Sequence, residues 1–130
     1  MKPKILLVED NDCNRYLVNF LLEREGFVVV VALNGNQAIE AARRDRPDLV
    51  VMDIQMPEMD GYEAAQRFKD DSALADIPLV GISSFAMAGD RAKALKVGFV
   101  GYIEKPINTA TFVQEVTRFL RPKTPPATEA

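Results

Sequence analysis

Short apolar segments alternate with longer amphipathic segments along this chain. The short segments are rich in valine, isoleucine and leucine and are predicted to be strands, at residues 5–8, 27–32, 49–52, 79–82 and 100–103. In the longer segments apolar residues recur every three or four positions, which predicts helices at residues 12–25, 37–46, 58–70, 88–97 and 109–120. Five strand–helix units in succession favour an α/β fold, a parallel sheet with helices on both faces.

Local signals support this division of the chain. The segment 5–8 is apolar at every position, which is typical of a strand buried on both faces. Gly26 is placed to end the first helix, and Pro47 follows the second. Residues 122–130 contain three prolines and little that a core would bury, so they are predicted to be a disordered tail after one folded domain at residues 1–121.

Composition limits the class of protein. The chain has 130 residues, of which 48% are hydrophobic and 27% charged, as in a globular protein. The net charge of −3 argues against a nucleic acid partner. Membrane insertion is not expected, since no apolar run approaches the ~18 residues that span a bilayer. The single cysteine, Cys13, is expected to be half-buried and cannot form an internal disulfide, which fits a cytoplasmic protein.

The chain contains no histidine. This excludes Ser-His-Asp and Cys-His catalysis, histidine metal sites and a phosphoryl group donated from the protein's own histidine. The first predicted strand is not followed by a glycine-rich phosphate loop, which argues against a nucleotide-binding fold. Carboxylates, lysines and hydroxyls must therefore carry the chemistry.

Polar residues follow four of the predicted strands. These are Glu9-Asp10, Asp53, Ser83-Ser84 and Lys105-Pro106. Ligand sites of open parallel sheets lie at the carboxyl ends of the strands, so these groups converge if their strands are central. Two carboxylates about 4 Å apart repel by roughly 4 kcal/mol at an effective dielectric of about 20, so a cation must offset the cluster. An all-oxygen site suits Mg²⁺, and acids with magnesium, lysine and a hydroxyl suit phosphoryl transfer.

Each of these residues has a simpler interpretation when taken alone. Glu9-Asp10 reads as a solvated turn, Asp53 as a helix cap and Lys105 as a surface lysine. Ser83 reads as a turn residue, with Ser84 as a competing hydroxyl. The conjunction at four strand ends favours a site, because independent caps need not align on one edge of a sheet.

Four motifs together resemble the response-regulator receiver family. They are Val8-Glu9-Asp10-Asn11, the segment from Asp53 to Gly61, the segment from Pro78 to Ser84, and Lys105-Pro106. The resemblance covers residues 4–121 and is strongest to stand-alone regulators of the DivK type and to receivers of hybrid histidine kinases. It implies a doubly wound, flavodoxin-like (βα)5 fold with five parallel strands in the order 2-1-3-4-5.

The resemblance also implies roles for the residues of the acidic cluster. Asp53 matches the phospho-acceptor, Asp10 the direct metal ligand and Glu9 the acid that holds the metal through water. The main-chain carbonyl of Gln55 matches a further metal ligand. The implied cofactor is Mg²⁺.

A second group matches the family's switch. Ser83 matches the hydroxyl that turns toward the phosphoryl group, and Lys105 the lysine that pairs with a phosphate oxygen. The Lys105-Pro106 bond is expected to be cis. Tyr102 matches a rotating aromatic residue, although core packing explains it equally well.

Surface residues of the first predicted helix form a candidate partner site. Tyr16 and Phe20 lie off the apolar stripe, so they either present an aromatic patch or pack under a neighbouring loop. In the family this helix meets the histidine phosphodonor. Pro106 is a further predicted partner contact.

The function implied is a signalling switch of a two-component system or phosphorelay. It would accept a phosphoryl group on Asp53 from a histidine kinase or histidine phosphotransferase with Mg²⁺, change its binding to an unidentified target protein, and slowly dephosphorylate itself. An aspartate-nucleophile phosphatase of the haloacid-dehalogenase kind is one alternative, but it requires an aspartate where Gln55 stands. A structural pseudo-receiver is another. The sequence is equally compatible with a free-standing regulator and with a fragment of a hybrid kinase.

Overall fold

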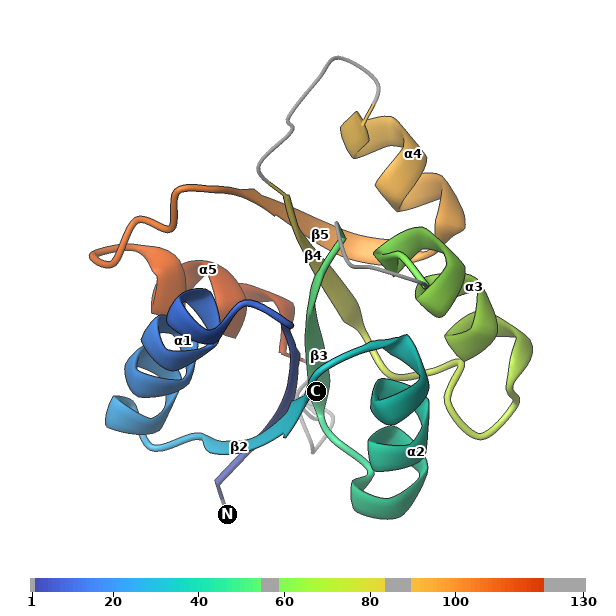
Figure 1. The fold of residues 1–130 in the computed structure, drawn as a ribbon, viewed down its shortest axis with the longest axis horizontal. Coiled ribbons are helices and arrows are strands. Elements are labelled where there is room, and N and C mark those ends of the chain that lie inside the picture. The colour runs from blue at the N-terminus through green and yellow to red at the C-terminus, as the bar shows by residue number, and fades with distance from the viewer. Residues whose placement is uncertain (1, 55–58, 84–89, 121–130) are drawn as a thin grey trace, which may run out of the picture.

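A computed structural model describes residues 2–54, 59–83 and 90–120 (Figure 1). The strands are β1 (Lys4–Val8), β2 (Val28–Ala32), β3 (Leu49–Asp53), β4 (Leu79–Ser83) and β5 (Phe99–Glu104). The helices are α1 (Asp12–Arg24), α2 (Gly35–Asp45), α3 (Gly61–Asp70), α4 (Asp90–Val97) and α5 (Phe112–Phe119). Strands and helices alternate in the predicted order.

The five strands form one parallel sheet in the order β2-β1-β3-β4-β5, which confirms the expected topology. Helices α1 and α5 cover one face of the sheet, and α2, α3 and α4 cover the other (Figure 1). The chain therefore reverses its direction of winding between β1 and β3. In such folds the strand ends at that reversal form the binding crevice.

The central strands are buried on both faces, as their unbroken apolar sequences predict. Every residue of β3 and β4 is buried. Alternate side chains of β3 enter two separate cores: Val50 and Met52 pack on the side of α2 and α3, whereas Leu49 and Val51 pack on the side of α1 and α5. This double burial fixes the position of Asp53, the last residue of β3.

Two helices begin later than predicted. Helix α3 begins at Gly61 rather than at residue 58, because Asp60 is its N-cap and accepts a hydrogen bond from the Glu63 amide at 2.9 Å. Helix α5 begins at Phe112 rather than at residue 109. Asn108 instead organises a turn over residues 109–111, accepting the Ala110 amide on its side chain at 3.0 Å.

Strand β5 contains an irregularity in its pairing with β4. Leu79 pairs with Phe99 and Val80 pairs with Gly101, so Val100 is an extra residue between two paired positions. Val100 is exposed, as expected for a β-bulge on an edge strand.

The Cys13 thiol is exposed, so the expectation that it is half-buried was wrong. Cys13 lies in the first turn of α1 on the same side as Tyr16 and Phe20, three and seven positions further along, which faces away from the sheet. Among the described helices, none is long and apolar enough to cross a membrane. The predicted tail at residues 122–130 and the predicted first two residues of α4 lie outside the described residues.

Candidate functional site

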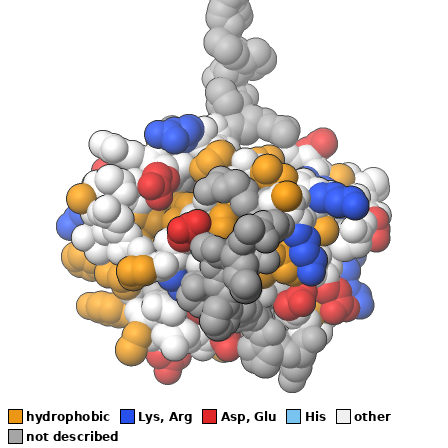
Figure 2. Space-filling model, turned by 90° about the horizontal axis from the view of Figure 1, so that it is seen from above, with side chains coloured by type: hydrophobic (Ala, Val, Ile, Leu, Met, Phe, Trp, Pro, Cys, Tyr) orange, Lys and Arg blue, Asp and Glu red, His pale blue; other side chains and the backbone are white. Residues whose placement is uncertain are grey.

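The sheet register brings the polar strand ends to one edge. Val8 pairs with Met52, so Glu9 and Asp53 follow at the same level of neighbouring strands. Asp53 in turn pairs with Ile82, one residue before Ser83. Figure 2 views this edge from above and shows acidic side chains near its centre. The predicted convergence of the strand ends is confirmed.

Three carboxylates form a compact cluster at this edge. Glu9, Asp10 and Asp53 each offer one oxygen, and these oxygens all lie within 4.8 Å of one another. Glu9 is 2% exposed and Asp53 4% exposed, whereas Asp10 faces solvent. A cluster of three acids with two members buried is electrostatically unfavourable by itself, so it requires positive charge nearby.

Lys105 supplies positive charge from the end of β5. Its Nζ lies 3.4 Å from Oδ2 of Asp53 and 3.6 Å from Oε1 of Glu9. The backbone amide of Lys105 donates to the carbonyl of Ser83 at 2.8 Å, which ties the ends of β4 and β5 together. The Lys105-Pro106 peptide bond is cis, as expected.

The pKa of Glu9 is raised from 4.5 to about 7. Burial is the main cause, because it disfavours the charged carboxylate, and a hydrogen bond with Asp53 and its negative charge act in the same direction. The positive charge of Lys105 and the amide of Asn11 partly oppose this rise. At neutral pH a substantial fraction of the Glu9 carboxyl groups therefore carries a proton in the metal-free protein.

The structure places the two predicted switch residues near this edge. Ser83 is 1% exposed at the end of β4, and Tyr102 is 6% exposed within the core on the side of α3 and α4. Tyr102 is thus packed inward in this structure. Gln55 and Ser84, the other predicted ligand and the competing hydroxyl, lie outside the described residues.

Gly61 holds α3 against the end of β3. Its amide donates to the carbonyl of Ile54 at 2.8 Å, and a Cβ at this position would lie 2.7 Å from Cα of Ile54 and 3.1 Å from the carbonyl oxygen of Asp53. A contact of 2.7 Å with backbone is too short, so α3 can approach this closely only because residue 61 is glycine. The helix thereby supports the backbone that carries Asp53.

The predicted partner residues are exposed. Tyr16 is 74% exposed and Phe20 50% exposed on the outward side of α1, so they form a surface patch and do not pack under a loop. The guanidinium of Arg24 lies 5.6 Å from the centre of the Phe20 ring. Pro106 is also exposed, at a hollow of about 380 Å³ that Tyr102 and Phe119 line as well.

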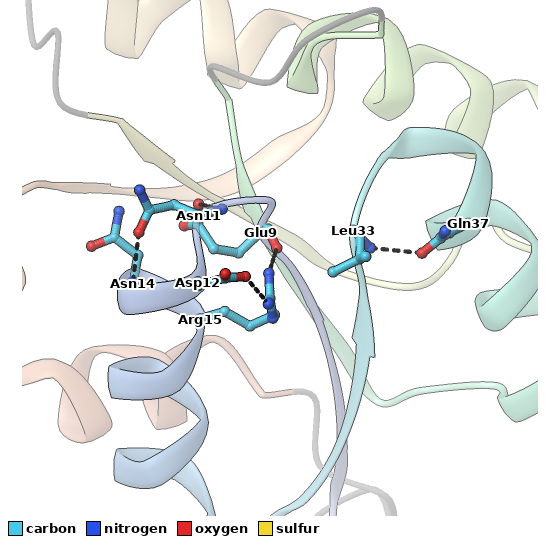
Figure 3. Close-up of polar contacts among 7 residues, drawn as sticks. All are labelled: Glu9, Asn11, Asp12, Asn14, Arg15, Leu33 and Gln37. Atoms are coloured by element: carbon cyan, nitrogen blue, oxygen red, sulfur yellow. Dashed lines mark hydrogen bonds and ion pairs between the residues drawn. The ribbon is translucent and has the colours of Figure 1, made fainter.

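One residue near the site was not predicted from the sequence. Arg15, in α1, donates from Nη1 to the main-chain carbonyl of Glu9 at 3.1 Å (Figure 3). An arginine within a predicted helix gives no sequence signal of a contact with a backbone carbonyl six residues earlier.

Comparison with known proteins identifies the class. A family model of the response regulator receiver domain matches residues 5–117. The chain belongs to this family and is a receiver domain of two-component signalling. Because the chain belongs to the receiver family, it is not a phosphatase of the haloacid-dehalogenase kind, the alternative enzyme class considered from the sequence.

Particular relatives agree with this assignment. The polar-differentiation response regulator DivK of Brucella anthropi is 38% identical over 120 residues, which cover 92% of this chain and 98% of that protein. DivK of Brucella ovis is 37% identical with the same coverage.

Solved structures show the same fold. Chemotaxis protein CheY4 of Vibrio cholerae has a TM-score of 0.87 at 27% identity, covering 92% of this chain and 100% of that one. The receiver domain of a sensor histidine kinase from Pseudomonas aeruginosa has a TM-score of 0.83 at 31% identity, covering 92% and 98%. That structure has a magnesium ion coordinated in its active site cleft.

Proposed function

We propose that this receiver domain accepts a phosphoryl group on Asp53 in a reaction that depends on Mg²⁺. The observation that carries the proposal is the position of Asp53, buried at the end of β3 between two further carboxylates and Lys105. An oxygen of the Asp53 carboxylate would attack phosphorus of a phosphohistidine, forming an O–P bond while the P–N bond breaks and its electron pair goes to the leaving imidazole nitrogen.

The donor set fits magnesium. All three candidate ligands are carboxylates, and two of them, Glu9 and Asp53, are buried, so a divalent cation would offset their charge. Asp10 and Asp53 would hold the ion directly and Glu9 through water, together with the carbonyl of Gln55. When bound, magnesium supplies charge that neutralises phosphate oxygens.

The residues around Asp53 support a switch. Lys105 already contacts Asp53 and would pair with an oxygen of the new phosphoryl group. Ser83, joined to Lys105 through a backbone hydrogen bond, would turn its hydroxyl toward the same group. Tyr102 would then change its packing beside α4 and α5. Added charge thereby alters the surface on which target proteins bind.

The proposed donor is a histidine kinase or histidine phosphotransferase. Tyr16 and Phe20 form an exposed aromatic pair on α1, the helix that follows the two acids at the end of β1. Pro106, which follows Lys105 in the chain, is exposed as well. An apolar helical surface that carries the donor histidine fits such a pair. The proposed place of action is the cytoplasm, as the sequence predicts, and slow self-dephosphorylation would end the signal.

Intact mass measurement after incubation with acetyl phosphate tests the proposal. Wild type and Asp53→Asn should be compared with and without Mg²⁺. We expect one phosphate adduct on wild type, lost in the variant and lost without the metal. No adduct on wild type with donor and magnesium in excess would overturn the proposal for isolated protein and favour a structural pseudo-receiver. An adduct that persists in Asp53→Asn would move the acceptor to another residue.

A further inference from the structure

Arg15 is fixed beside the acidic cluster by two different groups. Its Nη1 donates to the main-chain carbonyl of Glu9 at 3.1 Å, and its Nη2 forms an ion pair with the carboxylate of Asp12 (Figure 3). The Arg15 side chain is 22% exposed, whereas that of Asp12 is 90% exposed. A planar guanidinium that bridges two acceptors holds both in a defined orientation.

The carbonyl that Arg15 holds belongs to the peptide between Glu9 and Asp10. Because a peptide group is planar, fixing this carbonyl also fixes the amide of Asp10 and the direction in which its Cα follows. Arg15 therefore acts on the two residues that the proposed metal site takes from β1.

The other polar groups of Glu9 are also engaged. Its backbone amide donates to the carbonyl of Ala32 at 3.1 Å, and Oε2 accepts the amide of Asn11 at 3.2 Å. Oε1 lies 3.6 Å from Nζ of Lys105. Arg15 binds the main-chain carbonyl of Glu9, in addition to these groups. This contact connects the turn after β1 to a side chain of α1.

We propose that Arg15 is a positioning residue for the metal site. It holds the Glu9–Asp10 peptide so that both carboxylates face the one from Asp53, and Asp12 keeps its guanidinium in place. This inference rests on the proposed function, because it concerns the affinity of that site for magnesium.

The charge of Arg15 and its positioning role predict opposite changes in the affinity for Mg²⁺ when Arg15 is replaced. A positive charge near the cluster repels a divalent cation, so removing it should by charge alone strengthen Mg²⁺ binding. Removing a group that orients the ligands should weaken binding, and outer contacts of metal ligands are typically worth about 10-fold in affinity or more. The direction of the change in the dissociation constant therefore separates the two.

The test is a magnesium titration of the full-length, metal-free protein without any phosphodonor, followed by amide chemical shifts in NMR spectra. We expect the dissociation constant to rise about 10-fold in Arg15→Gln. Arg15→Lys keeps the charge but lacks the fork that bridges two acceptors, so we expect most of the same loss. Arg24→Gln is the matched control, since Arg24 is exposed roughly 13 Å further along α1, and its affinity should equal that of wild type.

Asp12→Asn completes the design. If Asp12 acts through Arg15, Asp12→Asn should weaken binding in the wild-type background but not further in Arg15→Gln. Unchanged or tighter Mg²⁺ binding by Arg15→Gln would overturn the positioning role. This includes the outcome in which the substitution lowers the free energy of unfolding in urea but leaves the dissociation constant for Mg²⁺ unchanged. No magnesium binding by wild type would instead overturn the metal site of the proposed function.

Discussion

Nζ of Lys105 lies 3.4 Å from Oδ2 of Asp53, although 52 positions separate the two residues in sequence. The contact depends on the pairing of β3 with β4 and of β4 with β5, which carries the end of β5 to the end of β3. Glu9 shares the same ammonium at 3.6 Å. One lysine thus partly neutralises two buried acids, and the stability of the metal-free protein should depend on it.

Replacing Lys105 with methionine should destabilise the metal-free protein. The variant keeps an apolar stem but leaves Glu9 and Asp53 without this ammonium, so the free energy of unfolding at pH 8 should fall by about 1–3 kcal/mol. The loss should be smaller at pH 5, where Glu9 is protonated. Urea denaturation at both pH values measures this. Lys96→Met, at an exposed position of α4, is the control and should change stability by at most about 0.5 kcal/mol. Equal losses in the two variants would contradict the prediction.

The raised pKa of Glu9 predicts how stability depends on pH. Because the folded-state pKa of about 7 exceeds the ordinary 4.5, the folded protein binds this proton more tightly than the unfolded chain. The resulting stabilisation is complete below about pH 4.5 and is lost as the pH rises through about 7. The Tm of the metal-free protein should therefore fall between pH 5 and pH 8, and Glu9→Gln should flatten this fall.

Asp71 does not interfere with this measurement. Its pKa is lowered from 3.8, mainly by its hydrogen bond with Arg43, so it titrates below the range in which Glu9 does.

Excess magnesium should offset the fall in Tm of the wild-type protein between pH 5 and pH 8, because the metal binds the deprotonated acid. A Tm that rises from pH 5 to pH 8 without metal would show that Glu9 is not protonated in the folded protein.

Gly61→Ala should affect both stability and the phosphoryl acceptor. The new Cβ would meet the backbone of Ile54, so α3 must move and we expect a loss of about 1–3 kcal/mol. The displaced backbone carries Asp53, so adduct formation with acetyl phosphate should also slow. Gly26→Ala is a useful control, since no atom lies within 4 Å of its Cβ position and its φ of +96° costs about 1 kcal/mol for alanine. It should lose stability without slowing the adduct.

The aromatic pair on α1 should matter for one phosphodonor only. Tyr16→Ala with Phe20→Ala removes exposed side chains, so we expect little change in stability. Transfer from a phosphorylated histidine phosphotransferase should slow about 10-fold if the pair is a binding hot spot. The rate with acetyl phosphate should not change. Leu95→Ala, equally exposed at 50% on α4, serves as the control. Equal slowing with both donors would exclude a docking role.

The sequence predicted the strands well, because central strands of a parallel sheet need apolar residues at each position. The segment ending at Asp53 is the clearest case, with every residue of β3 buried. The alternating pattern also predicted the parallel sheet and the edge at which polar residues gather. Strand order did not follow from this pattern and came from the resemblance to a family, since apolar periodicity does not say which strands are neighbours.

Helix starts and single polar contacts were beyond sequence reasoning. Asn108 begins a turn whose hydrogen bonds span three or four residues, as those of a helix do, so the start of α5 at Phe112 was missed. The contact between Arg15 and the Glu9 carbonyl depends on how one long side chain folds back over a turn. Cys13 was misplaced because it lies on the outward side of α1 with Tyr16 and Phe20, away from the buried residues of that helix.

The extra residue in β5 separates two segments of the strand that each keep their pairing with β4. Before the bulge, Phe99 enters the same core as its partner Leu79, on the side of α3 and α4. After it, Ile103 enters the opposite core with Phe112, and the ammonium of Lys105, two positions further, contacts Glu9 and Asp53. Because Leu79 and Val80 are consecutive in β4, a β5 without Val100 would pair with them as a regular strand. A homologous chain that lacks Val100 can therefore keep the same pairing from Gly101 onward, with its ammonium against the same two acids, so the insertion is a feature of the sheet edge on which the lysine contact does not depend.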